Sequence, residues 1–211
     1  MNIAILLYDG MTALDAMGPY EVLAAMPDAE INFVAKKAGI ITTDNGIPLL
    51  NAEKTLADVP APDMFLIPGG PDVSHVAADE EVLAWIRKAH ETTKWSTSVC
   101  TGALILGAAG VLEGLEATTH WMMHDQLREL GATPTLQRVI QQGKVFTAAG
   151  VSSGIDMALT LAAVEYGDDV AQEIQLIIEY DPEPPFNAGS PLKAPESVVN
   201  SLKAKFTELM Q

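Results

Sequence analysis

Residues 94–107 read KWSTSVCTGALILG and contain the one cysteine of the chain, Cys100. The residues before Cys100 predict a buried strand, and the apolar run that begins at Thr101 or Gly102 predicts a helix. A tight turn between strand and helix holds a nucleophile in an exposed, strained position above a parallel sheet. The free N–H groups and the dipole of the helix favour a thiolate and lower the pKa of a cysteine. A lone cysteine is also commonly a small buried hydrophobe, so both interpretations stand at this point.

Strands and helices alternate on both sides of this stretch. Four features organise the rest of the chain: buried strands, two hairpins, amphipathic helices and a segment that contains four prolines. The alternation of strands and helices predicts an α/β fold with one domain over residues 1–211. The predicted fold is a three-layer sandwich in which helices flank a mainly parallel sheet. Strands are predicted at 3–8, 31–35, 64–67, 94–99 and 117–121, hairpins at 39–51 and 136–147, helices at 14–26, 79–91, 102–109, 124–130, 155–166, 168–179 and 195–209, and an irregular segment at 181–191.

Composition excludes several classes of protein. The chain has 28 acidic and 12 basic residues, for a net charge of −16, and its basic residues form no cluster that could neutralise phosphates, which argues against nucleic-acid binding. No stretch reaches the about 18 apolar residues of a membrane span, and the first residues lack the features of a signal peptide. A single cysteine excludes an intrachain disulfide and fits a reducing cytoplasm.

Three strand ends carry residues suited to chemistry, and the ends of parallel strands meet in one crevice of an α/β sheet. Gly69 and Gly70 either leave two N–H groups free as an oxyanion site or form a plain turn. Asp15 is either a helix N-cap or a carboxyl group that faces the thiol of Cys100. Thr101 is either the first residue of a helix or a hydroxyl that contacts the site, and its N–H could join the oxyanion donors.

His120 follows two threonines at the end of a short predicted strand, where it is either a structural histidine or a catalytic one. The sequence contains no metal signature of the C-x-x-C, H-E-x-x-H or calcium-loop kind. It also lacks the G-x-G-x-x-G fingerprint of dinucleotide binding and the G-x-S-x-G of a serine hydrolase. We therefore expect no metal and no organic cofactor.

Five stretches together resemble the DJ-1/PfpI superfamily, which shares the class I glutamine amidotransferase-like fold. The resemblance covers essentially the whole chain and implies a flavodoxin-like, DJ-1-like sandwich. Within the superfamily the combination looks closest to the isocyanide hydratase branch, and the same stretches occur in sensor domains of AraC-type regulators. The stretches are LDAMGP at 14–19, IPGG at 67–70, SVCTG at 98–102, ATTHW at 117–121 and PPFNAGSP at 184–191.

The resemblance assigns roles to individual residues. It implies that Cys100 is the nucleophile, that Asp15 replaces the glutamate of DJ-1-like proteins, and that Thr101 and the Gly69–Gly70 pair complete the site. His120 aligns with a structural or pocket histidine of the family. PfpI-type proteases carry a histidine directly after the cysteine, where this chain has Thr101, which argues against peptidase activity. The resemblance also implies a homodimer that acts on a small molecule.

Three functions remain open on the sequence. The first is hydration of an isocyanide to an N-substituted formamide through a thioimidate on Cys100, with a protonated Asp15 as hydrogen-bond donor and then as base. The second is a glyoxalase- or deglycase-type reaction on 2-oxoaldehydes, in which His120 could be the base. The third is a non-catalytic redox or ligand sensor built on an oxidisable cysteine.

Overall fold

The computed structural model describes residues 1–209. Its contacts divide the chain into two compact units, Met1–Ile178 and Glu179–Gln211. The organisation of residues 1–211 as one domain stays a prediction.

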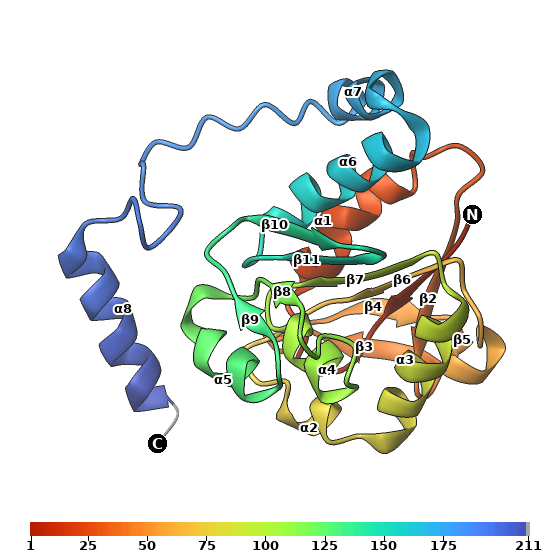
Figure 1. Ribbon diagram of the computed structural model, residues 1–211, viewed down its shortest axis with the longest axis horizontal. Coiled ribbons are helices and arrows are strands. Elements are labelled where there is room, and N and C mark those ends of the chain that lie inside the picture. The colour runs from red at the N-terminus through yellow and green to blue at the C-terminus, as the bar shows by residue number, and fades with distance from the viewer. Residues whose placement is uncertain (210–211) are drawn as a thin grey trace. The chain divides into compact units, whose positions relative to one another are not determined.

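A seven-stranded sheet forms the centre of the first unit (Figure 1). Every neighbouring pair runs parallel except β10 with β11, so the predicted mainly parallel sheet is confirmed. Strands β6, β7 and β11 are buried along their whole length, as expected where helices cover both faces of a sheet. In sheet order, the strands are β10 (Val139–Gln142), β11 (Val145–Ala148), β7 (Trp95–Val99), β6 (Met64–Ile67), β1 (Asn2–Leu6), β2 (Glu30–Ala35) and β5 (Lys54–Thr55).

Helices cover both faces of this sheet, which confirms the three-layer sandwich (Figure 1). On one face α1 (Ala13–Leu23) packs beside α6 (Ser153–Tyr166), and α7 (Asp168–Ile177) packs on α6. The other face carries α2 (Ser74–Ala77), α3 (Glu80–Thr92), α4 (Gly102–Ala108) and α5 (His124–Glu129). Helix α3 shows why these segments are helical, since its apolar residues recur every three to four positions and are buried, while the Asp79 side chain caps the Glu81 N–H.

Pro19 lies inside α1, at the point where α1 meets α6: a Cβ on Gly154 would lie 2.8 Å from Pro19 Cγ. One local prediction differs from the structure. The strand expected over 117–121 is wrong for most of its length. Only β8 (Glu116–Ala117) forms, paired with β9 (Thr133–Pro134), because Thr118 and Thr119 instead bond to side-chain and backbone groups of neighbouring strands and turns.

The remaining elements of the first unit are short. The predicted hairpin over 39–51 is confirmed as β3 (Gly39–Thr42) and β4 (Pro48–Ala52), a separate two-stranded sheet. The second predicted hairpin is β10 with β11, at the edge of the main sheet. Two 3₁₀ turns, η1 (Leu56–Asp58) and η2 (Trp121–Met123), complete the unit.

The second unit contains the predicted irregular segment and one helix. Residues 181–189 are exposed, and α8 (Glu196–Leu209) begins after Pro195, whose carbonyl accepts the Val198 and Val199 N–H groups. Phe186 and Leu192 are 79% and 74% exposed, which is unusual for such apolar side chains.

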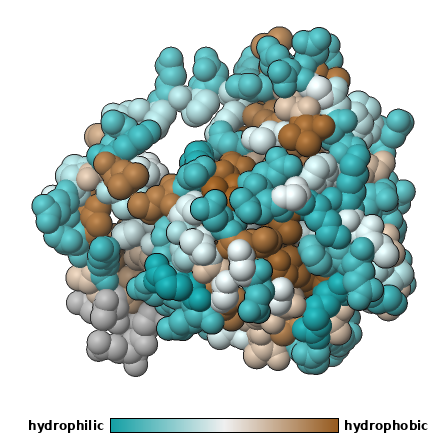
Figure 2. Space-filling model, in the orientation of Figure 1, coloured by the Kyte–Doolittle hydropathy of each residue, from teal (hydrophilic) through white to brown (hydrophobic). Residues whose placement is uncertain are grey.

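Hydrophilic side chains predominate on the visible face, with apolar patches between them (Figure 2). Within residues 1–209, no helix has the length and apolar character needed to cross a bilayer.

Candidate active site

The turn between β7 and α4 places Cys100 in a strained conformation. Its φ is 57°, in the left-handed region that non-glycine residues rarely adopt. Three hydrogen bonds hold this conformation: the Cys100 N–H donates to the carbonyls of Ala148 (3.0 Å) and Ala149 (3.2 Å), and the Thr119 hydroxyl donates to the Cys100 carbonyl (2.9 Å). The predicted strained turn is therefore confirmed. The expected exposure is wrong, because Cys100 is only 5% exposed.

Close backbone packing brings the end of β6 against this turn. A Cβ on Gly102 would lie 2.1 Å from the Ile67 carbonyl oxygen, and one on Gly69 would lie 2.5 Å from the Thr101 nitrogen. No side chain larger than hydrogen fits at either position without a backbone shift. The two glycines thus allow the loop after β6 to lie directly beside the turn that carries Cys100.

Asp15 lies in the first turn of α1 and is completely buried. Its Oδ2 accepts the Gly69 N–H at 2.9 Å, whereas its Oδ1 has no hydrogen-bond partner of acceptable geometry among the described residues. Burial raises the pKa of Asp15 to about 7, although hydrogen bonds from Gly69 and Cys100 act in the opposite direction. The N-cap of α1 is Thr12, so the N-cap interpretation of Asp15 is wrong.

Cys100 does not have the lowered pKa that its helix predicts. Burial and the Asp15 carboxylate raise the pKa of the thiol, and hydrogen bonding from Thr101 only partly offsets them. Two negative charges in one buried site repel each other, so Asp15 and Cys100 titrate as a pair. The carboxyl loses its proton before the thiol, because the pKa of Asp15 is about 7 and the pKa of Cys100 is raised well above its ordinary value.

The two glycines after β6 are not free oxyanion donors. The Gly69 N–H donates to Asp15 Oδ2 and the Gly70 N–H donates to Thr101 Oγ1 at 2.8 Å, so the prediction of two unoccupied N–H groups is wrong in this structure. Their donors instead bind the Asp15 carboxylate and the Thr101 hydroxyl oxygen. Thr101 lowers the pKa of the Cys100 thiol through its backbone N–H and, to a smaller degree, through its side chain.

His120 lies at the N-terminal end of η2, after the short strand β8. Its ring packs on the loop after β11, where a Cβ on Gly150 would lie 2.6 Å from His120 Cδ2. Gly150 follows Ala149, which accepts the Cys100 N–H, so His120 lies close to the turn that carries Cys100. Burial, and to a lesser degree His124, lower the pKa of His120, which keeps the ring neutral at pH 7.

Tyr8 belongs to the same region and was not predicted. It follows β1, is buried, and donates its hydroxyl to the Pro68 carbonyl at 2.8 Å. Burial raises the pKa of Tyr8 and keeps the phenol neutral, with smaller contributions from the charges of Asp15 and Cys100. The sequence holds one signal for it: Tyr8 is the polar-tipped residue at the end of a buried strand, directly before Asp9-Gly10.

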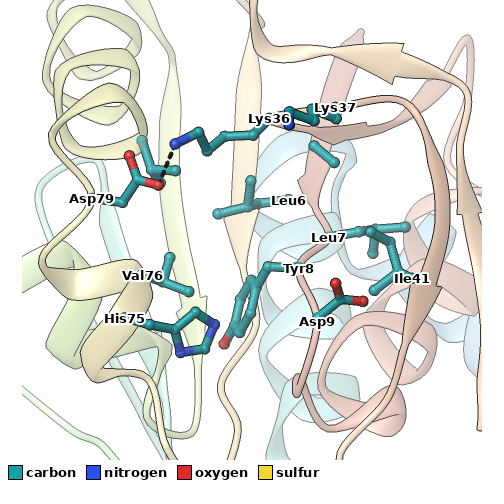
Figure 3. A pocket seen from close by; sticks show the side chains of 12 residues that line it. Leu6, Leu7, Tyr8, Asp9, Lys36, Lys37, Ile41, His75, Val76 and Asp79 are labelled. Atoms are coloured by element: carbon teal, nitrogen blue, oxygen red, sulfur yellow. Dashed lines mark hydrogen bonds and ion pairs between the residues drawn. The ribbon is translucent and has the colours of Figure 1, made fainter.

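A cavity of about 360 Å³ lies at the carboxyl ends of β1 and β2 (Figure 3). Tyr8 forms one wall and meets His75 edge to face, with ring centroids 5.9 Å apart, and the Lys36–Asp79 ion pair crosses the opposite side. Tyr8 lines this cavity, whereas Cys100 and Asp15 do not. Among residues 1–209, no three His, Cys, Asp or Glu side chains are grouped to hold a metal ion.

The sequence that forms this site matches a known family. The model of the DJ-1/PfpI family matches residues 1–164, more than three quarters of the chain. The chain belongs to the DJ-1/PfpI family. Its strained cysteine and paired acidic residue therefore sit in a DJ-1/PfpI scaffold.

Individual members of the DJ-1/PfpI family are similar to this chain over most of its length. The chain is 44% identical to the isonitrile hydratase of Pseudomonas putida over 205 residues, which are 97% of this chain and 90% of that protein. A ThiJ/PfpI family protein from Pseudomonas syringae, known from a crystal structure, aligns over 98% of this chain and 87% of its own with 40% identity and a TM-score of 0.92. A deglycase from Thermococcus kodakarensis is 30% identical over 63% of this chain and 80% of its own length.

Proposed function

We propose that this protein hydrates organic isocyanides to N-substituted formamides. The observation that carries the proposal is the buried pair of Cys100 and Asp15, in which burial raises the pKa of the carboxyl to about 7. The similarity to an isonitrile hydratase over nearly the full chain supports the choice of reaction. An isocyanide suits such a pair because its terminal carbon accepts a soft nucleophile and then needs a proton.

The first step joins sulfur to carbon. As the Cys100 sulfur attacks the terminal carbon of R–NC, the thiol proton passes to the Asp15 carboxylate, so the raised pKa of the free thiol is no obstacle. Asp15 then gives this proton to the same carbon. The product is a thioimidate, R–N=CH–S–Cys100, with no net loss of protons and no change that needs an oxidant. A carboxyl with a pKa of about 7 is well suited to accept and return a proton at neutral pH.

The second step adds water and releases the product. The water oxygen bonds to the thioimidate carbon while the Asp15 carboxylate takes a proton from that water. Asp15 then passes this proton to the nitrogen. The carbon–sulfur bond then breaks as the new hydroxyl becomes a carbonyl, which yields R–NH–CHO and returns a proton to Cys100. The Thr101 N–H, which acts on the sulfur, stabilises the negative charge that develops on sulfur as the carbon–sulfur bond breaks.

The decisive experiment uses benzyl isocyanide as the probe and follows N-benzylformamide by proton NMR. Wild type should turn over, and Cys100→Ala and Asp15→Asn should each lose at least about 100-fold in kcat/KM. A folded Glu21→Gln variant, which changes an exposed carboxyl on the same helix α1, is the matched control. Full activity in Cys100→Ala, or the absence of any turnover by wild type, would contradict the proposal.

A second candidate is favoured by the similarity to a deglycase. In a reaction on 2-oxoaldehydes, Cys100 adds to the aldehyde and a base moves a proton between the two carbons. The neutral ring of His120 beside the nucleophile turn is the candidate base. Loss of methylglyoxal, measured on the same preparation as isocyanide hydration, separates the two functions by their relative kcat/KM.

We further propose that the protein is a homodimer and works in the cytoplasm. Apolar side chains that are about three-quarters exposed support an interface: Leu176 and Ile177 at the end of the first unit, and Phe186 and Leu192 in the second. The one cysteine of the sequence supports a reducing location. Light scattering during size-exclusion chromatography tests the dimer, since a mass near 22.4 kDa would contradict it.

A further inference from the structure

One peptide unit links Tyr8 to Asp15. The Tyr8 hydroxyl donates to the Pro68 carbonyl oxygen at 2.8 Å, and the N–H of the same peptide unit, that of Gly69, donates to Asp15 Oδ2 at 2.9 Å. Because a trans peptide unit is planar, with its carbonyl and N–H pointing in opposite directions, the two hydrogen bonds hold it at its two ends. All three groups are buried.

We propose that Tyr8 is a positioning residue for Asp15: its hydroxyl fixes the Pro68–Gly69 peptide unit so that the Gly69 N–H stays on the Asp15 carboxylate. This deepens the proposed function, because Asp15 is the proton carrier of that reaction. Two properties of the chain of bonds support it. Donation to a carbonyl polarises the amide and strengthens its N–H as a donor. The unit also has no side chain at Gly69 that could hold it from another direction, since a Cβ there would meet Thr101.

Three titratable groups act on Asp15 or lie beside it. They are Cys100 at the turn after β7, Tyr8 after β1, and Asp44 in the β3–β4 hairpin, whose carboxylate accepts the Thr12 hydroxyl. On α6, which packs against α1, the acidic residue of the first turn is Asp156, and Arg138 pairs with it. No described cation pairs with Asp15, so the Gly69 N–H is the strongest group that favours its ionised form.

The test is the titration of the Asp15 carboxyl, followed by its ¹³C chemical shift in protein labelled at aspartate. The resonance is assigned by its absence from Asp15→Asn. Tyr8→Phe keeps the ring against His75 but removes the hydroxyl, and we expect it to move the midpoint upward by about 0.5 pH unit. Tyr166→Phe is a matched control, because Tyr166 also donates to the carbonyl of a proline, Pro27 at 3.0 Å, and is not among the groups that act on the pKa of Asp15. It should leave the midpoint unchanged.

A second measurement separates this effect from a direct action of Tyr8 on sulfur. Since Cys100 is the one cysteine, the rate of alkylation by iodoacetamide reports on that thiol alone. Tyr8→Phe should shift the pH profile of this rate in wild type but not in an Asp15→Asn background. An unchanged Asp15 midpoint in a folded Tyr8→Phe protein overturns the proposal, as does an equal shift in both backgrounds. Neither measurement uses an isocyanide, so both outcomes are independent of whether the proposed hydration occurs.

Discussion

Gly70 and Thr101 are joined by two hydrogen bonds that run in opposite directions. The Gly70 N–H donates to Thr101 Oγ1 at 2.8 Å, and the Thr101 hydroxyl donates to the Gly70 carbonyl at 2.6 Å. Both residues are buried, so one hydroxyl satisfies both polar groups of a glycine that water does not reach. Thr101 therefore ties the loop after β6 to the turn that carries Cys100.

This pairing predicts a specific cost for losing the hydroxyl. Thr101→Val keeps the shape of the side chain but leaves the Gly70 N–H and carbonyl buried without partners, which should lower the free energy of unfolding by about 2–3 kcal/mol. Isocyanide hydration should fall as well, because the loop that holds Asp15 is released. Thr101→Ser is the control, since it keeps the hydroxyl. Urea denaturation compares the variants, and equal stability of Thr101→Val and wild type would contradict the role given to the hydroxyl.

The buried carboxyl of Asp15 makes the stability of the protein depend on pH. The pKa of Asp15 is about 7 in the folded protein against an ordinary 3.8, so between these pH values the folded state holds a proton that the unfolded state has lost. Stability from this group is complete below pH 3.8 and is lost as the pH rises through about 7. Asp15→Asn removes the charge, so it should be more stable than wild type at pH 8, by on the order of 2–4 kcal/mol, while being inactive.

The measurement is urea denaturation of wild type and Asp15→Asn at pH 5 and pH 8. The advantage of the variant should be clearly smaller at pH 5 than at pH 8. Asp169→Asn, an exposed change in the first turn of α7, should show no such dependence. A difference that does not change with pH would show that Asp15 carries no buried charge at neutral pH.

Hydration should depend on pH through the same carboxyl. If Asp15 must be ionised to take the thiol proton, kcat/KM should rise as the pH increases through about 7 and then level off. The check is the initial rate with benzyl isocyanide at low concentration between pH 5.5 and 9. A rate that is highest at pH 5.5 and falls through pH 7 would mean that the protonated form starts the reaction.

His120 separates the two candidate reactions. Its ring packs on Gly150, and the proposed hydration uses Asp15 rather than His120 for proton transfer, so His120→Gln should lower kcat/KM for an isocyanide by less than about tenfold. For methylglyoxal, where the ring would be the base, the same change should cost about 100- to 10,000-fold. Parallel assays of one preparation give both numbers. A large loss in isocyanide hydration would instead assign His120 a proton-transfer role in that reaction.

The sequence by itself determined the class of the fold and most of the site. Period-two and period-3.6 patterns indicated most of the strands and helices. Strands that are buried on both faces, such as 64–67, were indicated by continuous apolar runs, since both faces pack against helices. The lone Cys100 between a strand and a helix pointed to the nucleophile turn. The glycines after β6 and the resemblance of LDAMGP at 14–19 directed attention to Asp15 and the loop beside it.

Only the tertiary structure decided what these groups do to one another. The helix behind Cys100 predicts a low pKa from local geometry, but burial and a carboxylate brought from residue 15 outweigh it. Glycine N–H groups that look free in sequence are used by Asp15 and Thr101. Tyr8 carries no motif at all. In each case the deciding contact joins residues 31 to 85 positions apart, and local patterns in a sequence carry no information about desolvation or about partners at such separations.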